Sequence, residues 1–157
     1  MTDTVKNKPS SRLSRRGFLF AGAAGFAAVA GARWFNIGAT TGDGALSVAD
    51  AHAGALEGRI ILVDIRRPDE WARTGVGEGA IPLDMRDTDF AEKLLNVVGG
   101  DYAAPVALIC ARGVRSRGLS KSLRAAGFTA IIDVPEGMLG SGAGPGWIKA
   151  GLPVIKG

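Results

Sequence analysis

Residues 105–116 read Pro-Val-Ala-Leu-Ile-Cys-Ala-Arg-Gly-Val-Arg-Ser, an apolar run that ends on the only cysteine and continues into a basic, glycine-containing loop. The run Pro105–Cys110 is typical of a β-strand that is buried on both faces. Helical periodicity follows over Ser116–Ala126 and stops at Gly127. The stretch therefore predicts a buried strand, a short loop and a helix, with Cys110 as the last residue of the strand.

Short apolar runs alternate with helical patterns on both sides of this stretch. We expect further strands at Arg59–Asp64, Ala80–Leu83 and Ala130–Val134, and helices at Ser47–Glu57, from Pro68 onward and over Phe90–Val98. This alternation is typical of an α/β domain with a mostly parallel sheet and helices on both faces. Ligands in such folds bind beyond the carboxyl ends of the strands, which is where the sequence places Cys110.

The residues after Cys110 indicate an anion-binding loop. A tight loop that enters the N-terminus of a helix directs several backbone N–H groups inward. The positive end of the helix, together with Arg112 and Arg115, favours a thiolate over a thiol. Gly113 suits a turn through positive φ. The alternative is a buried cysteine that acts as a small apolar side chain, but the arginines and the glycine favour a reactive one.

The single cysteine and single histidine restrict the other kinds of site. One cysteine excludes an intramolecular disulfide and a metal site built from cysteines. His52 would have to serve any Ser-His-Asp triad, but it falls within the predicted helix Ser47–Glu57. We interpret His52 as a packing or surface residue.

The net charge of +4 arises at the N-terminus. Residues 1–32 contain five basic side chains and one acidic side chain, and residues 33–157 contain 14 of each. A neutral body has no overall field that attracts a polyanion, so we expect no nucleic-acid partner.

The N-terminal segment resembles a twin-arginine export signal. Residues 14–20 read Ser-Arg-Arg-Gly-Phe-Leu-Phe, with Phe20 where the pattern usually has lysine, and an uncharged run extends from Gly17 to Ala32. Such a run would form a helix of roughly 24 Å, short of a hydrocarbon core of ~30 Å. Small-residue cleavage sites occur at residues 28–30 and 30–32.

We therefore expect the export machinery to bind the segment through Arg15 and Arg16, and the protein to be periplasmic. Residues 1–32 would be the signal peptide, residues 33–44 a linker and residues 45–157 the folded domain. Two alternatives remain open at this point. The run 17–32 could stay uncleaved as an anchor in the inner membrane, or the segment could be a disordered basic tail that leads into a soluble helix.

The loop Cys-Ala-Arg-Gly-Val-Arg resembles the active-site loop of rhodanese sulfurtransferases, whose usual form is C-R-x-G-x-R. The resemblance extends over about Leu46–Val154, through segments similar to the family's L-V-D-V-R, P-x-E-[FYW], G-A-I-x-I-P-L and A-G-L-P-V. These segments are Leu62–Arg66, Pro68–Trp71, Gly79–Leu83 and Ala150–Val154.

The resemblance implies the rhodanese fold, with five parallel strands and helices on both faces, and a persulfide mechanism. Cys110 would take sulfur from a small donor, thiosulfate or a persulfide, and pass it to a thiol or to cyanide. No metal or organic cofactor is implied. The residues that would bind the persulfide are Ala111, Arg112, Gly113, Val114 and Arg115. The residues that would support the loop are Asp64, Arg66 and Ser116.

The chain departs from the family pattern at three places. Ala111 stands where the first loop arginine is usual, and Arg112 follows one position later. Residues 75–80 lack the histidine that is often found before the third strand. An insertion, Gly140–Gly146, precedes Trp147, and we hypothesise that it lies at the mouth of the active site and selects the acceptor.

Two further functions compete with sulfur transfer by an enzyme. Phosphatases and arsenate reductases of related fold use a C-x5-R loop, but here only four residues separate Cys110 from Arg115. The domain could also be a sulfur carrier or a binding module without turnover.

Overall fold

The computed structural model describes residues 44–156. The predicted export signal, the alternative anchor and nearly all of the linker lie outside these residues. Within 44–156, no helix has both the length and the apolar character that are needed to cross a membrane. The elements in chain order are α2 (Val48–Leu56), β1 (Ile61–Asp64), α3 (Pro68–Thr74), β2 (Val76–Gly77), β3 (Ala80–Pro82), α4 (Phe90–Val97), β4 (Val106–Ile109), α5 (Val114–Ala125), β5 (Ile131–Val134) and β6 (Val154–Ile155).

The main sheet has four parallel strands in the order β3-β1-β4-β5, so the predicted α/β class is confirmed and the prediction of five strands is wrong. At the position of a fifth strand, Ala45 forms an isolated parallel bridge with Asp133. The N–H of Leu46 also donates a hydrogen bond of 2.9 Å to the Asp133 carbonyl. The pairing ends there because Ser47 already caps α2, accepting a 3.1 Å hydrogen bond from the Asp50 N–H.

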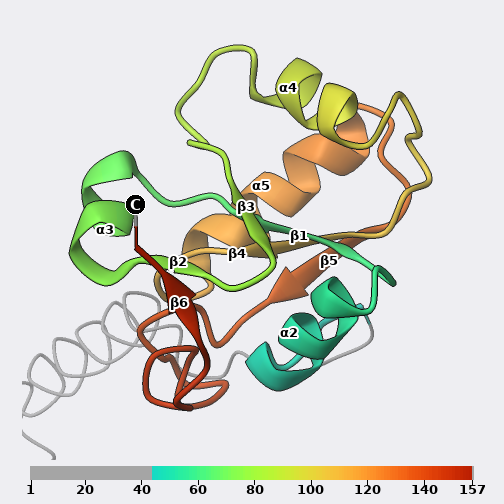
Figure 1. The fold of residues 1–157 in the computed structure, drawn as a ribbon. Coiled ribbons are helices and arrows are strands. Elements are labelled where there is room, and N and C mark those ends of the chain that lie inside the picture. Colours follow the sequence, from blue (N-terminus) through green and yellow to red (C-terminus); the bar gives the residue numbers. More distant parts are fainter. Residues whose placement is uncertain (1–43, 157) are drawn as a thin grey trace, which may run out of the picture.

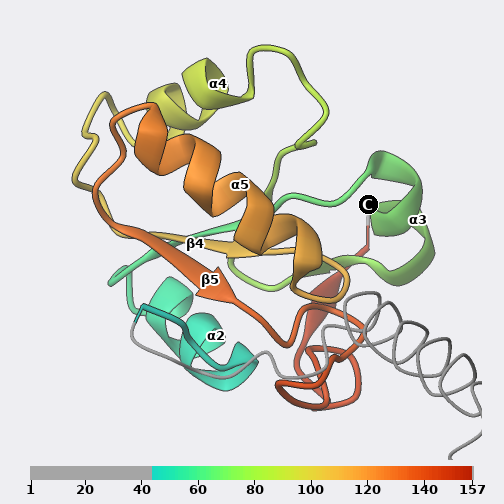
Figure 2. The same ribbon diagram turned by 180° about the vertical axis from the view of Figure 1, so that it is seen from behind.

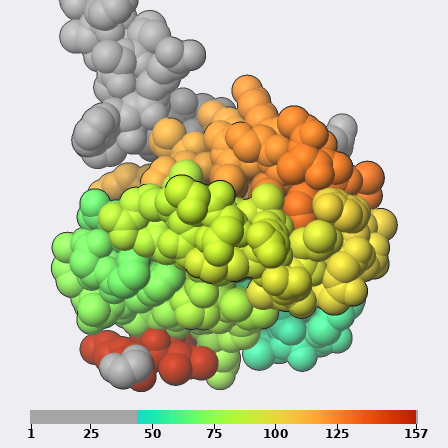
Figure 3. Space-filling model, turned by 90° about the horizontal axis from the view of Figure 1, so that it is seen from above, coloured from blue at the N-terminus to red at the C-terminus, as the bar shows by residue number. Residues whose placement is uncertain are grey.

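Helices cover both faces of this sheet (Figures 1 and 2). Helices α4 and α5 lie on one face, where the core includes Leu94, Leu108 and Leu123. Helix α2 lies on the other face, where Ile109 and Trp147 are buried. Figure 3 shows α4 and its flanking segments, in yellow-green, beside α5 in orange over the first face. Every residue of β4 is buried, as its uninterrupted apolar sequence predicts.

The starts of two elements differ from the sequence prediction by two residues for local reasons, and the other predicted boundaries agree to within one residue. Strand β1 begins at Ile61, not at Arg59, because the N–H groups of Arg59 and Ile60 bond to the Gly54 carbonyl in the turn that closes α2. Helix α5 begins at Val114, two residues earlier than expected. Gly113 adopts the left-handed conformation (φ 76°) and the helix starts directly after it. The loop between Cys110 and α5 is therefore very short.

A separate antiparallel pair joins β2 and β6. It returns the C-terminal segment to α3, and the indole N–H of Trp147 donates a 2.8 Å hydrogen bond to the Pro153 carbonyl. This arrangement places residues 135–150 next to the beginning of α5 in both ribbon views (Figures 1 and 2).

Candidate active site

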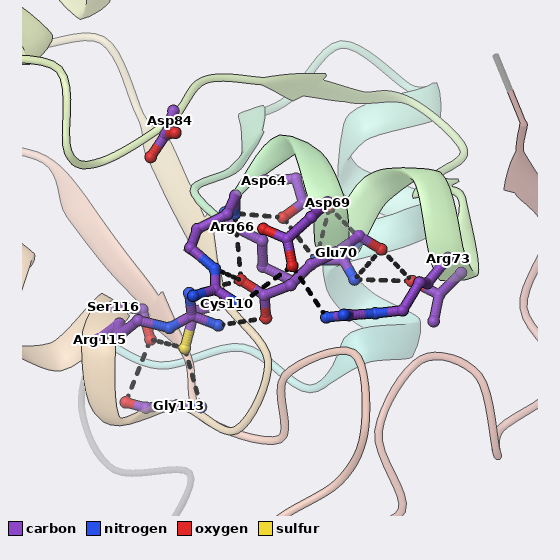
Figure 4. Close-up of polar contacts among 12 residues, drawn as sticks. Asp64, Arg66, Asp69, Glu70, Arg73, Asp84, Cys110, Gly113, Arg115 and Ser116 are labelled. Carbon is purple, nitrogen blue, oxygen red and sulfur yellow. Dashed lines mark hydrogen bonds and ion pairs between the residues drawn. The ribbon is translucent and has the colours of Figure 1, made fainter.

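Cys110 lies at the carboxyl end of the sheet, as the sequence predicts, but it directly follows β4 and is not its last residue. The residue is 1% exposed. Its sulfur accepts a hydrogen bond of 3.0 Å from the backbone N–H of Gly113, and the Ser116 hydroxyl oxygen lies 3.6 Å from it (Figure 4). The sulfur is therefore held in a polar pocket of the backbone and does not act only as an apolar core atom.

The turn at Gly113 gives the loop its shape. Its positive φ confirms the expectation for a glycine at this position. The N–H of Gly113 points to the sulfur, and its carbonyl accepts a 3.1 Å hydrogen bond from the Ser116 hydroxyl. The N–H and the carbonyl of Gly113 are thus both held by hydrogen bonds. Helix α5 begins directly after this residue, so its positive end lies at the sulfur.

Arg115 is held by Glu70, which comes from α3. The carboxylate of Glu70 accepts two hydrogen bonds of 2.7 Å from the Arg115 guanidinium and one of 3.1 Å from the Arg67 N–H. Partial burial alone would raise the pKa of Glu70. The hydrogen bonds from Arg115 and Arg67 and the charges of both arginines outweigh burial and lower that pKa to about 2.

The pKa of Arg115 is raised in turn. The main cause is its hydrogen bond to Glu70, and the charges of Glu70, Cys110 and Asp64 add to it. Arg115 is therefore a fixed positive charge next to the sulfur. The sequence interpretation assigned Arg115 to the site but did not recognise Glu70 as its partner. The sequence carries no local signal for this pair, because the two residues lie 45 positions apart and the half-burial of Arg115 follows only from the fold.

Asp64 and Arg66 form a buried ion pair that braces α3. Their side chains are 0% and 1% exposed, and the closest contact between them is 2.7 Å. The guanidinium of Arg66 also donates 2.7 Å hydrogen bonds to the Thr74 hydroxyl and to the Gly75 carbonyl, at the end of α3. The ion pair thus fixes α3, the helix that carries Glu70. Asp64 and Arg66 therefore support the active-site loop indirectly, through α3.

Residues 137–139 support the loop from the other side, and the sequence interpretation did not assign them to the site. The N–H groups of Met138 and Leu139 donate hydrogen bonds of 2.8 and 2.9 Å to the carbonyls of Cys110 and Ala111. A Cβ atom on Gly137 would lie only 2.6 Å from the Ala111 carbonyl oxygen. The sequence does not indicate this contact, because it depends on how the segment after β5 packs against the active-site loop.

The remaining loop residues differ in exposure. Ala111 is partly buried, whereas Arg112 and Val114 are exposed. The guanidinium of Arg112 donates a 3.4 Å hydrogen bond to the Gly140 carbonyl, at the start of the predicted insertion. The loop and the insertion are therefore neighbours in the fold.

His52 packs against Glu78 and Trp147. Its Nε2 is 2.9 Å from a carboxylate oxygen of Glu78, and its ring meets the Trp147 ring edge-on at a centroid distance of 5.2 Å. The structure thus places His52 in packing, as interpreted from the sequence. Within residues 44–156, no group of three or more His, Cys, Asp or Glu side chains could hold a metal ion.

The central feature of this α/β domain is a cysteine directly after a parallel strand, with a backbone N–H on its sulfur and the Glu70–Arg115 ion pair nearby. The family model for the rhodanese-like domain matches residues 47–140, which is more than half of the chain. The chain therefore belongs to the rhodanese-like domain family.

Several solved structures resemble this fold. The polysulfide-sulfur transferase homodimer of Wolinella succinogenes is 27% identical, with a TM-score of 0.56, over 86% of this chain and 90% of that one. The human single-domain sulfurtransferase TSTD1 is 19% identical, with a TM-score of 0.52, over 69% and 97%. A Rhodopseudomonas palustris protein described as a possible tyrosine phosphatase is 24% identical, with a TM-score of 0.52, over 71% and 83%. The last two likenesses show the fold alone. The family model and the likeness to the Wolinella transferase support a sulfurtransferase-type function.

Proposed function

We propose that this protein is a sulfurtransferase that moves sulfane sulfur from a donor such as thiosulfate to a nucleophilic acceptor through a persulfide on Cys110. The observation that carries the proposal is the 3.0 Å hydrogen bond from the Gly113 N–H to the Cys110 sulfur. A backbone donor aimed at sulfur stabilises a thiolate, and after loading it stabilises the persulfide anion that replaces it.

The reaction has two half-steps. The Cys110 thiolate attacks the outer sulfur of thiosulfate, a new S–S bond forms, the old S–S bond breaks, and sulfite leaves with the bonding electron pair. Cyanide or a thiolate then attacks the outer sulfur of the persulfide. The Cys110 thiolate leaves, and the products are thiocyanate or the acceptor persulfide. No proton needs to be transferred when each nucleophile reacts as its anion.

The cradle supplies electrostatic stabilisation in both steps. The N-terminus of α5 and the Arg115 guanidinium place positive charge near the sulfur. Glu70 fixes Arg115 by two hydrogen bonds, so the charge is in place before a donor arrives. The loop residues Ala111, Arg112, Gly113 and Val114 surround the anion, and Ser116 fixes the Gly113 carbonyl.

The loop length argues against phosphatase or arsenate reductase activity. Four residues lie between Cys110 and Arg115, one fewer than in loops that surround a tetrahedral oxyanion. Arg115 also has both of its terminal nitrogens on Glu70, so it would have to break an ion pair to bind a phosphate. A sulfur carrier that serves one partner remains the second candidate, because the same loaded cysteine serves a carrier and an enzyme.

Turnover separates an enzyme from a carrier. We expect the protein to form many equivalents of thiocyanate from thiosulfate and cyanide, and Cys110→Ser to form none. Because Cys110 is the only cysteine, no other thiol of the chain can take its place in that variant. Production of no more than one equivalent per protein would favour the carrier, and hydrolysis of para-nitrophenyl phosphate at a comparable rate would favour the phosphatase.

We further propose that the protein is exported to the periplasm through the twin-arginine pathway. The support is the sequence of residues 14–32 alone, with Arg15 and Arg16 before an uncharged run. A fusion of residues 1–44 to a reporter should reach the periplasm, and the double variant Arg15→Lys with Arg16→Lys should block transport. Transport that survives this replacement would contradict the assignment, and retention of the uncleaved fusion in the membrane would indicate an anchor.

A further inference from the structure

A pocket of about 360 Å³ lies between the active-site loop and the inserted segment. Arg112 and Lys149 line it together with Leu139 and residues of the segment Gly140–Pro145. Its volume falls in the lower part of the range for small-molecule sites, which is about 300–1,000 Å³. The pocket therefore has room for a compact ligand that is larger than thiosulfate.

The pocket is built into the fold and is not a gap under a loose loop. A carboxylate oxygen of Glu136, which is buried, accepts a 3.2 Å hydrogen bond from the Gly146 N–H. The Ser141 hydroxyl donates a 2.7 Å hydrogen bond to the Pro135 carbonyl. A Cβ atom on Gly144 would lie 2.5 Å from the Glu136 carboxylate. The glycines thus allow the segment to fold tightly upon itself and to keep one shape.

The charges that line the pocket have one sign. Arg112 and Lys149 contribute two positive charges, and no acidic side chain is among the residues that line it. Lys149 is exposed, and none of the described carboxylates forms an ion pair with it. Leu139 and Pro145 add apolar surface. The lining suits a ligand with negative charge at one end and a short carbon skeleton.

The active-site loop forms one wall of this pocket. Leu139 donates its N–H to the Ala111 carbonyl, and Arg112 reaches the Gly140 carbonyl. A ligand in the pocket is therefore next to the loop that carries Cys110.

We propose that this pocket binds the acceptor, and that the acceptor is a small thiol bearing carboxylates. The inference rests on the proposed sulfurtransferase function. Lys149 would bind a carboxylate of the acceptor, and the acceptor thiolate would attack the outer sulfur of the Cys110 persulfide. The new S–S bond forms on the acceptor, the old one breaks, and the Cys110 thiolate leaves with the electron pair, so charge and atoms balance.

The test uses protein loaded with thiosulfate and freed of donor, and it follows the second half-step alone. The probes are mercaptosuccinate, which carries two carboxylates, 2-mercaptoethanol, which is neutral, and cysteamine, which is cationic. The quantity compared is the transfer rate to mercaptosuccinate divided by the transfer rate to 2-mercaptoethanol. We expect this ratio to fall about tenfold in Lys149→Gln, because the variant loses a charge-assisted contact to a carboxylate. Lys149→Glu should reverse the preference towards cysteamine. The matched control is Lys121→Gln, an exposed lysine on α5 that does not line the pocket.

Two outcomes would overturn the inference. One is an unchanged ratio in Lys149→Gln in protein that loads sulfur normally. The other is an equal fall in Lys121→Gln, which would show only an effect of net charge. A failure of the wild-type protein to load sulfur would instead overturn the proposed function, and mass measurement before the acceptor is added distinguishes that case.

Discussion

The carboxylate of Glu70 accepts two hydrogen bonds of 2.7 Å from the guanidinium of Arg115, and this pair joins α3 to the first turn of α5 (Figure 4). The contact connects residues that lie 45 positions apart in the chain. The position of the Arg115 charge near the Cys110 sulfur therefore depends on the packing of α3, a helix that contributes no residue to the loop.

Replacement of Glu70 by glutamine should lower kcat/KM for thiocyanate formation by about tenfold, because a neutral amide loses the charge-assisted, two-pronged contact to Arg115. Arg115→Lys should lose activity as well, since lysine cannot form the two parallel hydrogen bonds. The control is Glu92→Gln, an exposed carboxylate on α4. Equal activity in Glu70→Gln and wild type would show that Arg115 does not need the Glu70 carboxylate to hold it in place.

The same pair makes a specific contribution to stability as a function of pH. The pKa of Glu70 is about 2 in the folded protein, against an ordinary value of 4.5. A carboxyl with a lowered folded pKa stabilises the fold above its unfolded pKa, and this contribution is lost as pH falls through the folded value. The stability difference between wild type and Glu70→Gln should therefore be constant from about pH 5 to 8 and shrink below about pH 4.5. Urea unfolding at several pH values measures it, and a difference that grows on acidification would contradict the account.

Gly137→Ala should damage the active-site loop, because the added methyl group would lie 2.6 Å from the Ala111 carbonyl at a residue with φ 69°. Gly151→Ala is the matched control, with a similar φ of 73° but no atom within 4 Å of the added Cβ. In the control, the free energy of unfolding should fall only by the cost of placing alanine in a left-handed backbone conformation, about 1 kcal/mol. Thermal unfolding and sulfur loading of both variants separate the two effects. Equal behaviour would mean that the close approach at Gly137 has no consequence.

Asp64→Ala should destabilise the fold by about 3–5 kcal/mol, because it leaves the buried Arg66 without its counter-charge. The double variant Asp64→Leu with Arg66→Met should recover much of that loss, since it removes both charges. Denaturant unfolding gives the three values. A double variant as unstable as Asp64→Ala would show that the hydrogen bonds of Arg66 to Thr74 and Gly75 matter more than the ion pair.

The four strands of the main sheet and the Cys110 loop follow from the sequence because their signals are local, whereas the two-residue strands β2 and β6 were not predicted. An unbroken apolar run predicts β4, and Gly113 predicts the turn that begins α5. The fifth strand was expected from family resemblance, yet residue 45 forms only one bridge because the cap at Ser47 starts a helix at once.

The partners of the site are non-local, and the pattern along the chain does not reveal them. Glu70 reaches Arg115 from another helix, and Gly137 meets Ala111 across the end of the sheet. Such contacts depend on how the elements pack, so sequence spacing alone could not place them. The insertion after Gly140 was recognised, but its pocket with Arg112 and Lys149 follows only from the fold.

The central claim is that Cys110 forms a persulfide, and mass spectrometry of the intact protein after incubation with thiosulfate tests it most directly. We predict that Cys110 gains one sulfur atom, about 32 Da, and that cyanide removes it with release of thiocyanate. A sulfinic acid adds the same nominal mass but survives cyanide, so reversal is the decisive observation. Absence of the adduct, or an adduct that cyanide does not remove, would contradict the account.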